Sequence, residues 1–218
     1  MLYELRTYEA MPGKLPALNT HLKVAADLFK SHELDVLGFW TDEFGASLQV
    51  TYMWMYKTFE DRQKKVAAFA SDSAWQQQVA QETEQAGVVV ARTHNTMLQL
   101  TPYSPEPQIK TKVQEWRIYD AVPGRLPDLH NRFANHTLGL FEKHGISNIG
   151  YWTEVFGTSN RLVYMLGYPS LGDREKSWKG FMKDPDWQKA RAESERTGPL
   201  VTKVYNRILR PTAYSSRG

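Results

Sequence analysis

The side chains best suited to chemistry form a polar triplet that occurs twice along the chain: Glu4, Arg6 and Tyr8, then Glu115, Arg117 and Tyr119. Alternate residues of a β-strand point to the same face, so each triplet would share one face of a strand. There, Arg could hold a carboxylate or an enolate, Glu could act as a general base, and Tyr could donate a proton. The same triplet could instead be a buried ion pair with a satisfied hydroxyl, which fixes how two sheets lie against each other. Residue types alone leave both interpretations open.

The two triplets belong to an internal repeat that spans almost the whole chain. Residues 4–16 return as 115–127, an offset of 111, whereas Gly38-Phe39-Trp40-Thr41 returns as Gly150-Tyr151-Trp152-Thr153, an offset of 112. The change of offset indicates one residue inserted near the end of the first helix of the second repeat. We therefore expect two units, residues 1–104 and 110–214, joined by a Pro-rich polar linker at 105–109.

Each unit has the hydrophobic pattern of a β-α-β-β-α-β fold. In the first unit we expect strands at 2–8, 36–41, 48–56 and 93–100, and helices at 15–29, at 59–69 and from residue 72 onward. This order is that of the ferredoxin-like α+β arrangement, with helices on one face of a four-stranded antiparallel sheet. The other face is bare, and two copies in one chain can pair their bare faces.

Strand alternation predicts which side chains lie between the sheets. We expect the apolar alternates, such as Leu5 and Trp116, to face the helices, so that the triplets point into the interior or its mouth. The third strand of each unit adds a largely aromatic face: Val50, Tyr52, Trp54 and Tyr56, matched by Leu162, Tyr164, Leu166 and Tyr168. An eight-stranded closed structure holds side chains or one small ligand, so this face is either filling or a pocket wall. A pocket is expected in the second unit, beside Glu115, Arg117, Tyr164 and Tyr168.

Composition narrows the classes of function. The 218-residue chain has no cysteine, which excludes disulfides, thiolate metal sites and a Cys nucleophile. Of its six histidines, His32 and His144 match each other at a helix end, where the helix dipole favours them, and the others have no counterpart. The basic cluster Arg62, Lys64 and Lys65 reads as a solvated helix face. We expect no metal, cofactor, nucleic-acid partner or membrane span, and a cytoplasmic protein because the N-terminus lacks a signal-peptide layout.

The run Tyr3-Glu4-Leu5-Arg6-Thr7-Tyr8 through Pro12-Gly13-Lys14-Leu15, repeated from Glu115 to Leu126, resembles the NIPSNAP family. The Gly-aromatic-Trp-Thr strand and the Asp-x-x-Trp helix start resemble it as well. The resemblance covers both units and implies a tandem NIPSNAP protein. It also implies the dimeric α/β barrel fold, two ferredoxin-like units packed sheet to sheet. That barrel hosts small monooxygenases, haem enzymes and stress-induced proteins, so the fold alone fixes no activity.

Three functions follow as hypotheses. The first is a cofactor-independent enzyme or binding protein that takes a small aromatic or carboxylated molecule in the barrel. Its catalytic candidates are the two triplets, and its ligand-binding candidates are Tyr52, Trp54, Trp152, Tyr164 and Tyr168. The second is a non-catalytic interaction protein whose barrel is plugged by side chains, and the third is a haem-using barrel enzyme. We also expect a homo-oligomer that associates through the remaining sheet edges.

Overall fold

The computed structural model describes residues 1–215, and its first half is the β-α-β-β-α-β unit that the hydrophobic pattern predicts. The Thr58 hydroxyl accepts the Asp61 N–H at the start of the second helix, and the Asp72 carboxylate accepts two backbone N–H groups at the start of the third. The elements are β1 (Leu2–Ala10), α1 (Leu15–Ser31), β2 (Asp35–Phe44), β3 (Gln49–Tyr56), α2 (Phe59–Ala70), α3 (Ser73–Ala86) and β4 (Val90–Leu100).

The second half repeats this order with one change in its first helix. Ser170 and Asp184 take the capping positions of Thr58 and Asp72. The elements are β5 (Val113–Ala121), α4 (Leu126–Arg132), the π-helical turn η1 (Phe133–Thr137), α5 (Leu138–Lys143), β6 (Ser147–Phe156), β7 (Arg161–Tyr168), α6 (Leu171–Lys183), α7 (Pro185–Ser194) and β8 (Val201–Pro211).

The extra residue of the second repeat is accommodated by η1. The continuous helix α1 of the first unit corresponds to the run α4–η1–α5, which is one residue longer. A π-turn adds a residue without shifting either flank, so the offset is still 111 at Leu22 and Phe133 but is 112 at Phe29 and Phe141. The insertion therefore lies in the middle of the helix and not near its end as expected. Such turns are frequent at functional sites.

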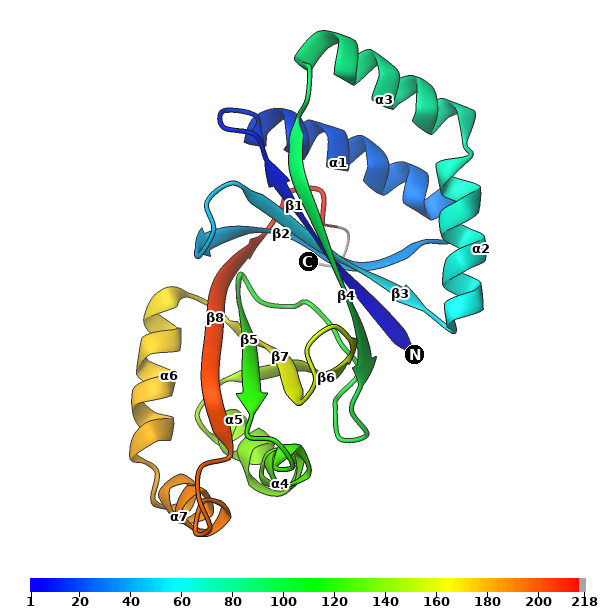
Figure 1. Ribbon diagram of the computed structural model, residues 1–218. Helices are drawn as coiled ribbons and strands as arrows, with labels where there is room; N and C mark the ends of the chain where they lie inside the picture. The colour runs from blue at the N-terminus through cyan, green and yellow to red at the C-terminus, as the bar shows by residue number, and fades with distance from the viewer. Residues whose placement is uncertain (216–218) are drawn as a thin grey trace.

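The eight strands form one closed antiparallel barrel in the order β1-β3-β2-β8-β5-β7-β6-β4. The sheets of the two units join at two seams, β2 with β8 and β4 with β6. Helices α1–α3 cover one outer side and α4–α7 the other (Figure 1). Across residues 1–215 every strand has two neighbours, so the expected association through free sheet edges is wrong. A homo-oligomer formed in another way is still a prediction.

The interior of the barrel is filled mostly by apolar side chains, which reverses the predicted orientation of the strands. One buried cluster draws on both units and includes Leu5, Trp40, Trp116 and Trp152. The rings of Tyr3 from the first unit and Trp152 from the second lie 5.6 Å apart in this interior. The apolar alternates thus face inward and the polar triplets face the helices. Sequence alternation separates the two faces of a strand, but it does not say which face the helices cover.

The Gly-aromatic-Trp-Thr motif is explained by this interior packing. A Cβ on Gly38 would lie 2.6 Å from the Trp40 ring, and a Cβ on Gly150 would lie 2.4 Å from the Trp152 ring. Each indole therefore folds over the glycine two residues earlier on the same face of its strand. A larger residue there would displace an indole from the centre of the barrel.

Candidate functional site

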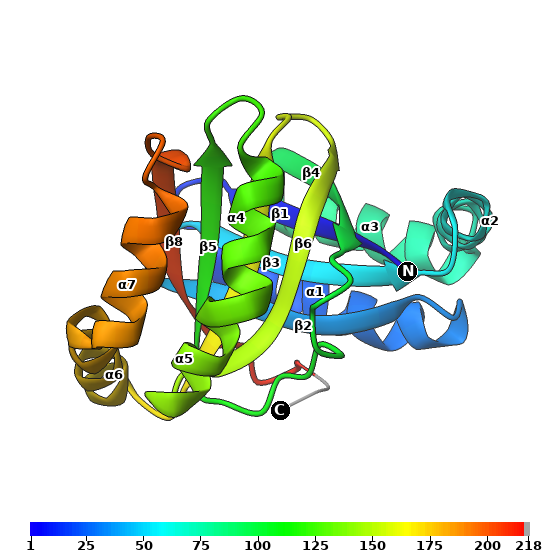
Figure 2. The ribbon, with the colours of Figure 1, turned by 90° about the horizontal axis from the view of Figure 1, so that it is seen from below.

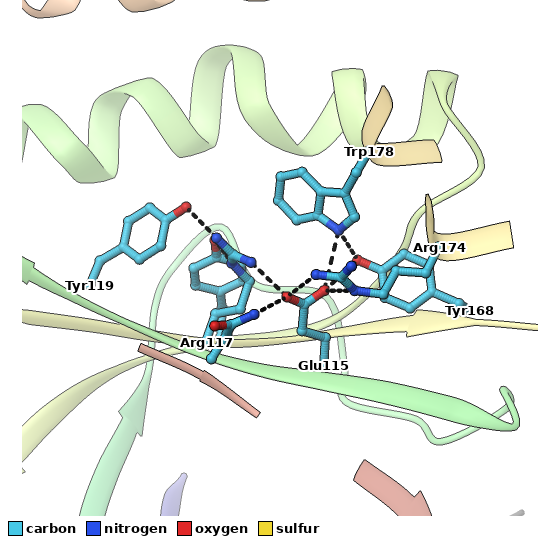
Figure 3. Close-up of polar contacts among 8 residues, drawn as sticks. Glu115, Arg117, Tyr119, Tyr168, Arg174 and Trp178 are labelled. Carbon is cyan, nitrogen blue, oxygen red and sulfur yellow. Dashed lines mark hydrogen bonds and ion pairs between the residues drawn. The ribbon is translucent and has the colours of Figure 1, made fainter. Parts of the chain in front are cut away.

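The second polar triplet lies on the outer face of β5, beneath helix α6. Glu115 is fully buried and accepts six hydrogen bonds. Arg174 donates two of them from Nε and Nη2, both at 2.7 Å, and Arg117 donates one from Nη1 at 2.6 Å. The other donors are Tyr168, Trp178 and Asn206. Figure 3 shows the two guanidinium groups approaching the carboxylate from either side.

These contacts keep Glu115 ionised. Burial opposes its charge, but the hydrogen bonds from Arg174 and the charge of Arg117 outweigh burial and lower its pKa to about 2. A carboxylate with so low a pKa and so many donors has little tendency to take another proton. The geometry favours a structural role for Glu115, in which it orients Arg117, over the general-base role that residue types also allowed.

Arg117 and Tyr119 extend from this ion pair toward a cavity. The Arg117 guanidinium donates to Tyr164 at 2.8 Å and to Tyr119 at 3.1 Å, and it lies 4.6 Å above the ring of Trp178. With the bond to Glu115, three of its five N–H donors have a partner within residues 1–215. Although burial opposes its charge, the neighbouring Tyr164, Tyr119 and Glu115 raise the pKa of Arg117, so it stays cationic.

The cavity has a volume of about 390 Å³ and lies between the outer face of the second sheet and its helices. Figure 2 shows α4 along the outer face of β5 and β6, with α7 beside it. Its apolar wall includes Phe133, Phe141, Phe181, Trp178 and Trp187. Its basic side chains are Arg117, Arg132, Arg191 and Lys203, and Glu195 is the one carboxylate in the described lining. The cavity is therefore aromatic and electropositive.

Arg132 is a second cation of this cavity, and it is buried. Its side chain is 4% exposed, and it donates from Nη1 to Glu195 at 2.8 Å. It also lies 5.3 Å from the Trp187 ring centre. Its Nε has no hydrogen-bond partner in the described part of the chain. An unpartnered buried donor is costly, so a ligand that accepts from it would be stabilised there.

The π-turn shapes the same cavity. Two residues of η1, Phe133 and Thr137, are buried and line it. The Thr137 hydroxyl donates to the carbonyl of Arg132 at 3.2 Å, five residues earlier, and so supports the wide turn. The inserted residue of the second repeat therefore lies beside Arg132 and changes the wall of the cavity.

The first triplet repeats the ion pair but not the electropositive cavity. Arg62 holds the buried Glu4 carboxylate through Nε at 2.7 Å and Nη2 at 2.9 Å, and Arg6 donates to it at 3.3 Å. The prediction that Arg62 belongs to a solvated helix face is therefore wrong. The sequence did contain a signal for this role, because Arg62 matches Arg174 at the 112 offset. Each unit therefore has both the buried glutamate and the arginine that binds it.

The ligand-binding candidates divide between two places. Tyr52 and Trp54 are buried between the sheet and helices of the first unit, in its own hydrophobic cluster. Tyr164 and Tyr168 are buried in the corresponding cluster of the second unit. Trp152 lies on the opposite face, inside the barrel, and is separated from the triplets by the sheet. Of the candidates named from the sequence, Arg117 and Tyr119 line the cavity of the second unit, and Tyr8 lines one in the first.

Residues that sequence reasoning missed are those at which the repeats differ. Trp178 stands where the first unit has Val66, Arg132 where it has His21, and Arg191 where it has Val79. The triplets lie at positions that the two units share, whereas these three cavity residues lie at positions where the units differ. Positions near Arg117 at which the second unit differs from the first were the signal that could have identified this cavity.

The histidines at the helix ends have carboxylate partners. His32 Nε2 lies 2.7 Å from Asp72, and His144 Nε2 lies 2.6 Å from Asp184, so each ties a helix end to the N-cap of a later helix. In the described residues no group of three or more His, Asp or Glu side chains is placed to hold a metal ion. Residues 1–215 also contain no helix that is both long and apolar enough to cross a bilayer.

Comparison with known proteins matches both halves of the chain to one family. The NIPSNAP family profile matches residues 3–105 and 114–216. A Caenorhabditis elegans NipSnap protein is 23% identical over 99% of this chain, which spans 40% of that relative's length. Danio rerio NipSnap homolog 1 is 21% identical over 98% of this chain and 76% of its own.

Two solved structures share the fold across nearly the whole chain. A monooxygenase candidate from Fusobacterium nucleatum is 10% identical, with a TM-score of 0.64 over 96% of this chain and 91% of its own. An anthrone oxidase-like protein is 9% identical, with a TM-score of 0.59 over 99% of this chain and 92% of its own. At these identities the likeness extends to the α/β-barrel fold.

Proposed function

This chain belongs to the NIPSNAP family, and we propose that it binds a small aromatic carboxylate in the cavity beneath α4, α6 and α7 of its second unit. The observation that carries the proposal is Arg117, 11% exposed and held by Glu115 at the wall of a cavity of about 390 Å³. Charge-assisted hydrogen bonds from a preoriented guanidinium are the interactions that recognise a carboxylate.

The walls of the cavity support a flat ligand. The indole of Trp178 and the rings of Phe133 and Phe181 surround the space beside Arg117. Aromatic rings give a planar ligand a large contact area at low entropic cost. A ligand of this kind would lie outside the barrel, because the interior is filled by side chains from both units.

The proposal is tested by isothermal titration with 2-naphthoate, and with the neutral 2-naphthamide for comparison. We expect the carboxylate to bind and Arg117→Gln to weaken it about 10–100-fold, since a charge-assisted bond contributes about 1.5–3 kcal/mol. Arg6→Gln is the matched control, because Arg6 makes the equivalent contacts to Glu4 and Tyr8 in the other unit.

A second variant separates binding from folding. Val204 lines the mouth of the cavity and is 48% exposed, so Val204→Trp should block entry without disturbing the ion pair. Equal affinities of the parent, Arg117→Gln and Val204→Trp for naphthoate would refute the proposal, as would equal affinities for acid and amide. Circular dichroism of each variant checks that the fold is intact.

The filled interior favours one further candidate, a non-catalytic interaction protein. Trp40, Trp116 and Trp152 occupy the space in which a barrel ligand would bind. Failure of every carboxylate to bind would support this role. The haem hypothesis is checked in the same samples, because a Soret absorption band in the protein as purified, before any haem is added, would support it.

A further inference from the structure

The first unit has a cavity of its own, with different chemistry. It has a volume of about 460 Å³ and lies between helices α1 and α3 and strands β1 and β4. Its walls include Trp75 and the valines at 79 and 88–90. No arginine or lysine lies among its described lining residues, whereas the second unit has four basic side chains there. This cavity therefore suits an uncharged, apolar molecule.

A histidine–glutamate pair lies in the wall of this cavity. His21 Nδ1 is hydrogen-bonded to a carboxylate oxygen of Glu82, and the other Glu82 oxygen accepts from Gln78 at 2.6 Å. A carboxylate at Nδ1 favours the tautomer with the proton on Nδ1, which leaves the lone pair on Nε2. No partner for His21 Nε2 exists in the described residues. The ring is 17% exposed and packs beside Trp75, with centroids 4.9 Å apart.

A hydroxyl group in the same cavity complements this base. Tyr8 Oη accepts from Arg6 Nη2 at 3.2 Å and from Tyr52 Oη at 3.3 Å. Because both contacts can be accepted by its oxygen, its own proton is available to a ligand, and the cationic Arg6 polarises the O–H bond. Tyr8 thus offers a donor and His21 an acceptor within one apolar space.

We propose that this cavity is a proton-transfer site for an uncharged, unsaturated carbon acid, with His21 as general base oriented by Glu82. In the step, Nε2 takes a proton from a carbon next to a carbonyl or related group. The C–H electron pair moves into the substrate, and the oxygen that gains charge accepts from Tyr8. Returning the proton to another carbon completes an isomerisation, so no oxidant or reductant is needed.

The general base is tested with 5-nitrobenzisoxazole, a flat neutral probe. Removal of its ring C–H proton by the base breaks the N–O bond and opens the ring to a single product, a coloured phenolate that carries a nitrile group. The oxygen leaves with the electron pair, so the reaction needs only a base. We expect the protein to accelerate this reaction in mildly alkaline buffer, and His21→Ala to lower the rate about 10²-fold. Glu82→Gln should lower it less, because the imidazole is present but no longer oriented.

Two controls isolate the cavity from surface histidines. His94 also contacts a glutamate, Glu9, at 3.0 Å, but it is half exposed and lines no described cavity, so His94→Ala should leave the rate unchanged. Val79→Trp should block the cavity and lower the rate without touching the pair. Val204→Trp, which blocks the cavity of the second unit, should leave the rate unchanged.

If the His21–Glu82 pair only joined α1 to α3, substitutions at these two residues would leave the reaction rate unchanged. The proposal is overturned if the parent reacts no faster than free imidazole, or if His21→Ala and His94→Ala lower the rate equally. Nitrogen NMR of the imidazole provides a readout that survives a poorly folded His21 variant. A proton found on Nε2 and not on Nδ1 in the parent would also overturn it.

Discussion

Replacing Glu115 with glutamine is expected to lower the free energy of unfolding by about 3–5 kcal/mol at neutral pH. The carboxylate is fully buried and neutralises part of the charge of both Arg117 and Arg174. Glutamine has nearly the same shape, so little packing is lost. The variant instead leaves two guanidinium groups without an anionic partner, and it turns an amide NH₂ toward their N–H donors.

The pKa of Glu115 gives an independent magnitude for the same interaction. Its pKa falls from 4.5 to about 2 on folding. At about 1.4 kcal/mol per pKa unit this corresponds to about 3 kcal/mol. Because the folded-state pKa is the lower one, the contribution is complete above pH 4.5 and is lost as the pH falls from 4.5 toward 2. The stability gap between parent and Glu115→Gln should therefore narrow through that range.

Urea unfolding followed by circular dichroism, at pH 7 and at steps down to about pH 3, measures this gap. Glu43→Gln is the control, since Glu43 pairs with Arg210 at the surface, where an ion pair contributes about 0–1 kcal/mol. A Glu115→Gln loss below 1 kcal/mol, or a gap that does not change with pH, would refute the reasoning. Either result would mean that water or relaxation already satisfies the two arginines.

Two further substitutions and one deletion test other parts of the fold. Gly150→Ala should cost about 1–3 kcal/mol in chemical unfolding, because its methyl group would overlap the Trp152 ring; an unchanged midpoint would contradict the interior packing. Deletion of Asn135 should convert η1 into regular helix and preserve the fold by circular dichroism but weaken naphthoate binding, whereas unchanged affinity would separate the π-turn from the cavity. Asp42→Asn should destabilise the β2–β8 seam, where Arg207 bonds the buried carboxylate at 2.6 Å, and hydrogen exchange there should rise.

Much of the fold could be predicted because the chain repeats itself. Every element of the first unit has a counterpart in the second, and two weak hydrophobic patterns at matching positions support each other. The helix expected from residue 72, for example, has its counterpart in α7, and the matching aspartates Asp72 and Asp184 cap the two helices. The fold class, the tandem repeats and the family were confirmed.

The orientation of the strands could not be predicted, because both of their faces are buried. In a sheet with one solvated face the polar residues point to water, but here Glu115 lies under α6 and Trp116 lies inside the barrel. Alternation then does not show which face of a strand the helices cover. That face is identified only by the ion pair between Glu115 and Arg174, a residue of helix α6. The candidate site could be predicted only in part, because repetition marks some of its residues and not others. Arg117 and Tyr119 were identified by repetition, and Arg132 was missed because it is not repeated.

The two seams between the units have a consequence for how the protein can change over time. Where two separate copies of one chain close such a barrel, every mutation appears in both halves, and dilution separates them. Here residues 101–112 connect the halves, so the barrel closes at any protein concentration. Each half can also mutate alone. His21 in one half and Arg132 in the other occupy the same position of the repeat, so a single gene can maintain two unlike chambers on one symmetric frame.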